Sequence, residues 1–195
     1  MSMAAMPLAP AAKTPLVLPR RGARVTLRRF LASDLRVFQS YRHDIELGRY
    51  QGWLPTSDEA ALKFLAEVGS VEHFVPGEWV QIAVADSDTL ALVGDIGVHL
   101  RADCTQAEIG FTLQRESQGR GLATDAVRCA IAMIFEHTPV DAIVGITDAR
   151  NSPSMRLLER VGMTLQSTAE SVFRGETCVE HTYVAARPSR IAPAA

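Results

Sequence analysis

The sequence predicts a mixed α+β fold in which helices flank a central mixed sheet of about seven strands. Three strand-like segments follow one another between residues 79 and 113, and the short polar turns between them are typical of an antiparallel meander. A long amphipathic helix then begins at Leu122, and a strand, a helix and two further strands follow it. Strands in both orientations, with helices between them, indicate a sheet that helices cover.

In the first half of the chain, apolar and polar residues alternate over 24–30, which predicts a strand. Helical spacing follows over 35–43 and again over 56–68, where Ser57 can serve as the N-cap. The three strands of the meander come next. They are predicted at 79–86, 90–100 and 106–113.

In the second half, the long helix carries two neighbouring rows of apolar residues with a spacing of four. The rows are Leu122, Ala126, Ala130, Ile134 and Ala123, Val127, Ile131, Phe135. They predict a helix of about five turns with a wide apolar face. A buried strand at 142–147 and a helix over 152–163 follow, with Gly162 at the C-cap of that helix. The last two strands are predicted at 164–173 and 178–186.

The length and composition suit one domain. We expect it at 23–187, between a flexible Ala/Pro-rich tail at 1–22 and a second tail at 188–195. The net charge of −2 provides no basic field for nucleic acid or an anionic membrane. The first tail lacks the order of a signal peptide, and no apolar run is long enough to span a bilayer.

The cysteines and histidines indicate neither a disulfide framework nor a metal site. The chain has three cysteines and no C-x-x-C motif, which favours a reducing, cytoplasmic compartment. Its five histidines are scattered without the spacing of metal ligands, so no metal is expected.

Gly119 and Gly121 flank Arg120 at the point where a strand gives way to the long helix. Glycine allows close backbone approach, and the first turn of a helix leaves N–H groups unpaired with a partial positive charge. Together these features make a phosphate cradle, to which Arg120 can add a charge-assisted contact. A tight strand-to-helix turn without a ligand is the alternative.

Two common nucleotide-binding loops fit this segment poorly. A P-loop requires Gly-Lys-Ser/Thr, and the segment has no lysine. A dinucleotide-binding fold requires a small residue where Thr124 stands, within a parallel unit that usually comes early in the chain. Here the loop follows an antiparallel meander in the middle of the chain, which disfavours both.

Three motifs in order resemble the GCN5-related N-acetyltransferase (GNAT) superfamily. Residues 118–123 (QGRGLA) match its Q/R-x-x-G-x-G/A signature, and residues 151–163 (NSPSMRLLERVGM) look like its N-x-x-[AS]-x-x-L-[YL]-x-x-x-G-[FM] segment. Residues 107–113 (AEIGFTL) are similar to its central strand. The resemblance covers roughly 24–186. Residues 41–53 (YRHDIELGRYQGW) suggest the branch that resembles ribosomal-protein N-terminal acetyltransferases.

The resemblance implies an acetyl-CoA-dependent N-acetyltransferase. In the family, backbone N–H groups of the glycine loop bind the pyrophosphate, and the end of the central strand pairs with pantetheine. That strand and the next one splay apart, and an N–H near Leu113 would polarise the thioester carbonyl. The cofactor-binding residues that the motifs imply are Phe111, Thr112, Leu113, Gln118, Gly119, Arg120, Gly121, Leu122, Ala123, Thr124 and Asn151.

The reaction is direct attack by an amine, which must first lose a proton to a base. Glu108 is the candidate base, and an ordinary solvent-facing strand residue is its alternative reading. Many family members protonate the CoA thiolate with a tyrosine, but Leu158 stands at that position. Ser154, one helical turn earlier on the same face, is the candidate donor, although water could serve instead. Asn151 completes the candidate catalytic set, or it is simply a residue that caps the helix.

Tyr50 and Trp53 are the candidate acceptor-binding residues, because the family walls its acceptor site with this segment. Both could instead pack beneath a long loop. The sequence leaves open whether the acceptor is a protein N-terminus or a small-molecule amine, and whether the chain forms the homodimers common among similar proteins. Because the tyrosine is missing, a catalytically weak acetyl-CoA sensor or partner-binding module is the second hypothesis.

Overall fold

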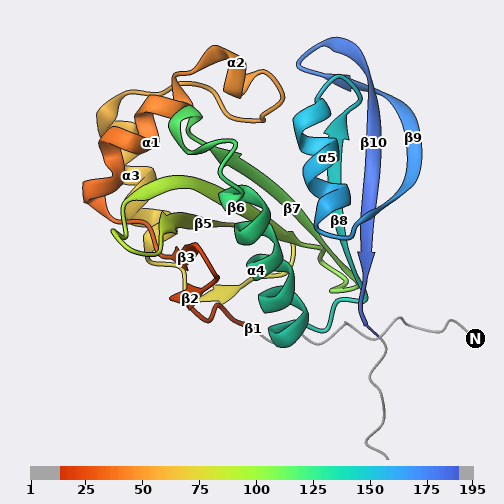
Figure 1. Ribbon diagram of the computed structural model, residues 1–195, viewed down its shortest axis with the longest axis horizontal. Coiled ribbons are helices and arrows are strands. Elements are labelled where there is room, and N and C mark those ends of the chain that lie inside the picture. Colours follow the sequence, from red (N-terminus) through yellow and green to blue (C-terminus); the bar gives the residue numbers. More distant parts are fainter. Residues whose placement is uncertain (1–13, 189–195) are drawn as a thin grey trace, which may run out of the picture.

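The computed structural model describes residues 14–188, and its main feature is an eight-stranded sheet in the order β2-β3-β5-β6-β7-β8-β10-β9 (Figure 1). Its strands are β2 (Arg20–Arg21), β3 (Val25–Arg28), β5 (Trp79–Asp86), β6 (Leu92–Leu100), β7 (Gln106–Leu113), β8 (Ala142–Asp148), β9 (Thr164–Phe173) and β10 (Glu176–Ala186). All neighbours pair antiparallel except β7 and β8, which are parallel. A separate antiparallel pair joins β1 (Thr14–Pro15) to β4 (His73–Phe74).

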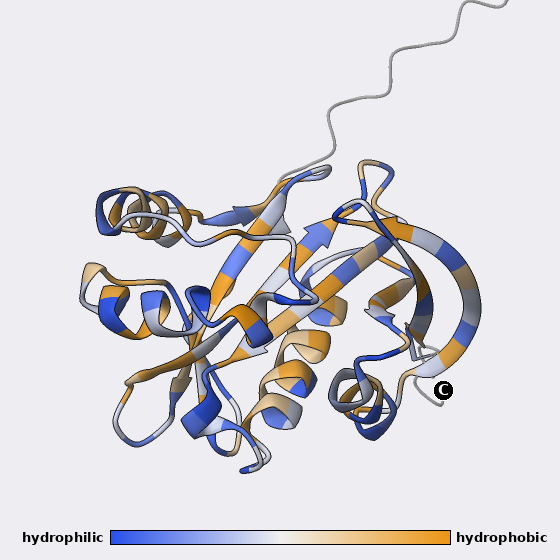
Figure 2. Cartoon of the chain, turned by 90° about the horizontal axis from the view of Figure 1, so that it is seen from above, coloured by the Kyte–Doolittle hydropathy of each residue, from blue (hydrophilic) through white to orange (hydrophobic). Residues whose placement is uncertain are grey.

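Five α-helices accompany the sheet. They are α1 (Leu35–Arg42), α2 (Ile45–Gly48), α3 (Asp58–Gly69), α4 (Leu122–His137) and α5 (Ser152–Arg160), with short 3-10 helices at Ala32–Asp34 and Arg115–Ser117. Helix α4 packs on β3, β6 and β7, and α5 packs on β8 and β9, whereas α1 and α3 contact β6 and β5. In Figure 2 the helices combine hydrophobic and hydrophilic residues, as expected of amphipathic helices on a sheet.

The core lies in two layers, one on each face of the sheet. Ile82 and Val84 pack into the larger cluster with α4, whereas Ala83 between them packs into a smaller cluster with Phe38 of α1 and Leu65 of α3. Alternate residues of a strand face opposite sides, so α1 and α3 cover the face that α4 does not. On that face the helices cover only part of the sheet. Trp79 at the start of β5 therefore keeps half of its surface exposed.

The predicted fold class and the seven long strands are confirmed, and the structure adds short elements that sequence patterns did not reveal. Strands β1, β2 and β4 have two residues each, and α2 has four, too few to show a period. The predicted N-cap Ser57 accepts a hydrogen bond from the N–H of Ala60.

The predicted N-terminal tail at 1–22 is wrong over its last nine residues. Leu16 is buried in the main core, and its N–H donates to the carbonyl of Glu72. Arg20 forms an ion pair with Glu136 of α4. The Ala/Pro-rich composition gave no period, but a few apolar anchors are enough to fix this segment. Residues 1–13 and 189–195 lie outside the described residues.

The sheet splits between β7 and β8, and this split positions the site. The two strands pair only from Gln106–Ala142 to Glu108–Val144, and no further pairs follow between them in the described structure. Beyond Glu108, β7 continues along β6 while β8 continues along β10. A V-shaped gap therefore opens in the middle of the sheet, as the family resemblance implied.

Candidate active site

The glycine loop adopts the backbone conformation that requires its glycines. Gly119 has φ of +72° and Gly121 has φ of +79°, in the left-handed region that other residues rarely adopt. Gly121 is the N-cap of α4, and glycine has no side chain with which to cap the first turn. The first intrahelical bond is donated by Asp125 to the Gly121 carbonyl, so the N–H groups of residues 122–124 precede the helical ladder and remain available to a ligand.

Side chains from outside the helix hold this loop in place. Gln118 donates from Nε2 to the carbonyl of Leu113 at 2.9 Å, and Arg24 donates to the carbonyl of Arg120 at 2.7 Å. The carboxylate of Asp125 accepts backbone bonds from residues 23–25 at the start of β3. These contacts satisfy the loop carbonyls and fix α4 to β3, which leaves the loop N–H groups facing outward.

A cavity of about 350 Å³ and one of about 650 Å³ meet at the gap in the sheet. The larger one lies against the glycine loop, and most of the predicted cofactor-binding residues line it. They are Phe111, Thr112, Leu113, Gln118, Gly119, Gly121, Leu122, Ala123, Thr124 and Asn151. Arg120 does not line it in the described structure, although Arg150, Arg156 and Arg160 do. The larger cavity is therefore rich in cationic side chains and helix N–H groups, which suits an anionic ligand.

The backbone of β7 presents free groups to the gap. The Gln114 N–H donates to Val93 on the β6 side, and Gln106 accepts from Arg101 on the same side. Backbone groups alternate along an antiparallel pair, so Phe111 and Leu113 turn theirs toward β8 instead. Gln51 donates to the Phe111 carbonyl at 3.4 Å, consistent with this orientation. Thr112, expected to pair with pantetheine, instead directs its backbone groups to β6.

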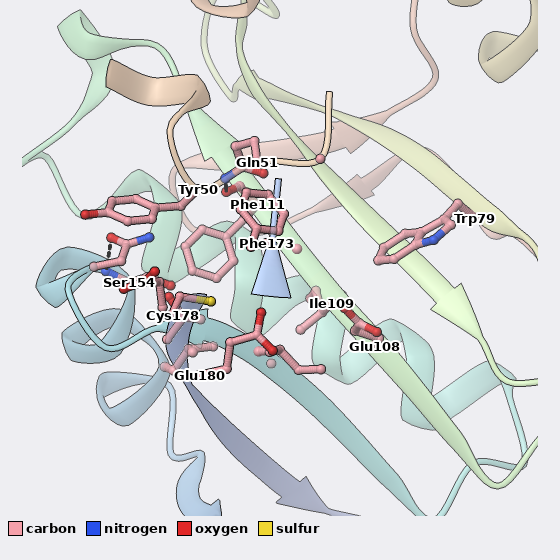
Figure 3. Close-up of a pocket in the computed structure, with 18 residues that line it drawn as sticks. Tyr50, Gln51, Trp79, Glu108, Ile109, Phe111, Ser154, Phe173, Cys178 and Glu180 are labelled. Carbon is pink, nitrogen blue, oxygen red and sulfur yellow. Dashed lines mark hydrogen bonds between the residues drawn. The ribbon is translucent and has the colours of Figure 1, made fainter. Parts of the chain in front are cut away.

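The smaller cavity extends from the gap along the sheet face that α1 and α3 leave open (Figure 3). Glu108 lines it at the point where β7 and β8 part. Glu180 of β10 and Trp79 of β5 line the same cavity, although neither was a predicted site residue. Gly97 lies beside Trp79, and a Cβ built there would be 3.2 Å from the indole ring, so the ring lies flat over the sheet.

The carboxyl group of Glu108 is half-buried, and its surroundings raise its pKa. Burial is the largest cause, the charge of Glu180 acts in the same direction, and the neighbouring His99 opposes it. Burial disfavours the charged carboxylate, and a second negative charge disfavours it further. A carboxyl group with a raised pKa is a stronger base when it is deprotonated, which suits proton transfer from an amine.

The predicted residues of α5 come together at the junction of the two cavities. Ser154 and Asn151 line both, and the Asn151 side chain also caps α5 by accepting from the Ser154 N–H at 3.4 Å. Leu158, in the position of the missing tyrosine, is 1% exposed and packs against Gly145 of β8. An apolar side chain there leaves Ser154 as the hydroxyl nearest that position on this face of α5.

Of the two predicted acceptor residues, the structure brings one to the site. Tyr50 lines both cavities. Trp53 lines neither in the described structure: the Arg42 guanidinium stacks on its ring at 4.7 Å, and Gly48 packs against the ring. Arg42 is itself paired with the buried Asp95. Trp53 thus fixes the loop that carries Tyr50 and Gln51, and Gln51 takes its place in the cavity walls.

Residues 24–164 match the family model of the acetyltransferase (GNAT) domain. The chain belongs to the GNAT acetyltransferase family. The GNAT domain match spans the glycine loop, the split strands and α5, the three parts from which both cavities are built. Membership makes the chain an acyltransferase and confirms the family that the three motifs indicated.

Individual GNAT relatives agree with this assignment. An uncharacterized N-acetyltransferase p20 of Bacillus licheniformis is 26% identical over 136 residues, covering 69% of this chain and 76% of that protein. RimL, a ribosomal L7/L12 alpha-N-protein acetyltransferase solved with coenzyme A, superposes with a TM-score of 0.70 at 14% identity, over 90% of this chain and 98% of RimL. Spermidine N-acetyltransferase of Vibrio cholerae, solved with CoA and spermine, gives 0.71 at 17% identity, over 85% and 96%.

The described part of the chain contains neither a metal-binding cluster nor a membrane-spanning helix. Residues 14–188 contain no group of three or more His, Cys, Asp or Glu side chains placed to hold a metal ion. Within the same residues, no helix combines the length and the hydropathy needed to cross a membrane.

Proposed function

We propose that this GNAT protein transfers an acetyl group from acetyl-CoA to a primary amine by direct attack. The observation that carries the proposal is the meeting of two cavities of opposite charge at the gap between β7 and β8. Acetyl-CoA is anionic at its phosphates and carries the thioester at its far end, whereas an amine acceptor is cationic before it reacts.

Acetyl-CoA would occupy the larger cavity. The N–H groups of residues 119–124 would bind the pyrophosphate, with Arg156 and Arg160 available to the phosphates. The backbone N–H groups of Phe111 and Leu113, which no strand pairs in the described structure, would bind pantetheine. This arrangement directs the thioester into the gap, where the N–H of Leu113 would stabilise the oxyanion of the tetrahedral intermediate.

The acceptor would enter the smaller cavity and lose a proton to Glu108, directly or through water. The amine nitrogen then attacks the thioester carbon, and collapse of the intermediate breaks the C–S bond. Ser154 would donate its hydroxyl proton to the departing sulfur and regain a proton, directly or through water, from the nitrogen, which loses it to become the neutral amide. Asn151 would position the pantetheine beside it. RimL acts on a protein N-terminus and the Vibrio enzyme on spermidine, so both acceptor classes occur among the structural neighbours.

The test begins with the melting temperature of the full chain, measured with acetyl-CoA and with ATP and NAD as controls. A ligand that binds only the folded state raises it by mass action. We expect a rise with acetyl-CoA alone, followed by release of CoA thiol when amines are added. Absence of a rise would contradict the assignment of the larger cavity.

Leu158 in the position of the usual tyrosine favours a second candidate function, an acetyl-CoA sensor or partner-binding module without efficient transfer. The same experiment separates the two candidates. A rise in melting temperature with acetyl-CoA, but no thiol release with protein N-terminal peptides or small amines, would favour the binding module.

A further inference from the structure

The smaller cavity holds two carboxylates without ion-pair partners, which distinguishes them from the three buried acids of the described structure. Asp34, Asp95 and Asp148 are each paired with an arginine, at 2.8, 2.7 and 2.6 Å. No ion pair among the described residues includes Glu108 or Glu180. Burial of a carboxylate costs free energy unless a positive charge compensates it. A bound cation would provide that compensation for these two carboxylates.

The other residues that line the smaller cavity also favour a cationic ligand. Of residues 14–188, no Lys, Arg or His lines the smaller cavity. Asp148 also lines it, but Arg150 neutralises that carboxylate. Trp79 contributes a half-exposed indole, and Phe173 adds a second aromatic wall. The His99 ring packs beside the indole, with ring centroids 5.3 Å apart, and half of the Trp79 surface stays exposed. Aromatic faces attract cations, and the exposed part of the indole on the open sheet face provides such a surface.

The positions of these groups separate two roles. Glu108 lies at the apex of the gap, beside the entry for the thioester, whereas Glu180 approaches from β10 on the far side of that gap (Figure 3). Trp79 lies two strands from Glu108 in the same register row, through His99. Neighbouring strands are about 4.8 Å apart, so β5 lies about 10 Å from the strand that carries the base. The indole lies beside Gly97 of β6, between those two strands.

One reacting amine cannot use all of these groups. A single nitrogen at Glu108 leaves Glu180 uncompensated and the indole without contact. We propose that the acceptor carries a second positive charge besides the reacting amine, and that Glu180 and Trp79 bind this second cationic group. The inference rests on the proposed transfer function and names the class of its substrate, a small dication such as a diamine.

The test compares acceptors of one length that differ in the second charge. 1,5-Diaminopentane, n-pentylamine and 5-aminopentan-1-ol are assayed by CoA thiol release at saturating acetyl-CoA, and their binding is followed by melting temperature. We expect kcat/KM for the diamine to exceed that for either monoamine by about tenfold or more, as one charged hydrogen bond provides.

Two variants test which side chains discriminate the diamine from the monoamines. We expect Glu180→Gln to reduce the ratio of diamine to monoamine kcat/KM by about tenfold, and Trp79→Leu to reduce it by about threefold. The ratio cancels any effect of Glu180 on the basicity of Glu108, because both acceptors use the same base. Glu170→Gln on exposed β9 removes the same charge outside the cavity and should leave the ratio unchanged.

The outcomes separate the inference from the function on which it rests. Thiol release at equal efficiency with diamine and monoamines would overturn the inference and leave the acetyltransferase function standing. An unchanged ratio in Glu180→Gln would overturn the role of that carboxylate. A lack of thiol release with every amine, despite a rise in melting temperature with acetyl-CoA, would overturn the transfer function itself and the inference with it.

Discussion

The two cavities that meet at the split sheet differ in charge and in how the chain builds them. The larger cavity takes its N–H groups from the glycine loop and the start of α4, and its arginines from residues 150–160, which include α5. The smaller cavity takes its acids and aromatic rings from β5, β7 and β10 and from the tip of the β9–β10 hairpin. The proposed cofactor cavity is thus encoded locally, whereas the proposed acceptor cavity is assembled from distant strands.

The cavities share one wall, and there the opposite charges meet. The residues that line both are Tyr50, Gln51, Phe111, Asn151 and Ser154. None of these side chains carries a full charge at neutral pH. Under the proposed function, a neutral wall between a cationic and an acidic cavity would keep the phosphates and the amine in separate cavities while their reactive ends approach.

The largest expected effect concerns the acidic cavity. Glu108→Gln removes the proposed base while preserving its shape, and loss of general base catalysis lowers kcat by about 10²–10⁴-fold. The KM for acetyl-CoA should change little, because Glu108 lies outside the larger cavity. Steady-state kinetics measure both parameters, with Glu170→Gln as the control that removes an exposed carboxylate. Retention of the full rate in Glu108→Gln would refute its role as base.

A smaller effect is expected from breaking the cationic cavity. Gly121→Ala forces a side chain into φ of +79°, which costs about 1–2 kcal/mol and disturbs the N–H groups of the loop. We expect the affinity for acetyl-CoA to fall by about tenfold or more, as for loss of one charge-assisted hydrogen bond. Isothermal titration calorimetry measures this change.

Gly77→Ala is the matched control for that experiment. Gly77 has φ of +86° and lines neither cavity in the described structure. Both variants should therefore lose similar stability, and their melting temperatures should each fall by about 2–8 °C. If Gly77→Ala weakened acetyl-CoA binding as much as Gly121→Ala, the loss would reflect general destabilisation and the phosphate cradle would be refuted.

The smallest expected effect is a shift in the pH dependence of kcat/KM, which tests the electrostatics of the smaller cavity. Burial and the charge of Glu180 raise the pKa of Glu108. Since the base must be deprotonated, activity is lost as the pH falls through that raised pKa. Glu180→Gln removes one cause, so the acidic limb of kcat/KM should move to lower pH. The profile is measured with n-pentylamine, which lacks a second charge. A limb that stayed in place or moved to higher pH would contradict the coupling of the two carboxylates.

How far the sequence predicts this site depends on the separation of its residues along the chain. The glycines at 119 and 121 and Ser154 could be found because short motifs contain them, and Glu108 because it precedes a strand motif. Trp53 was expected in the acceptor wall but lines neither cavity in the described structure, and no local signal shows that Arg42 stacks on its ring. Arg156 and Arg160 are four residues apart in the helix that follows Asn151. This spacing places them on one face of the helix, so a cationic wall could have been predicted from it.

The sequence by itself determined the mixed fold, the seven long strands and the conformation of the glycine loop. These follow from periodicity, from turn residues and from a backbone conformation that glycine alone adopts readily. The tertiary structure alone decided that Glu180 and Glu108 line the same cavity, where Trp79 lies, and that Leu16 is buried. These depend on the order and register of strands that lie up to 100 residues apart in the chain, which local patterns do not specify.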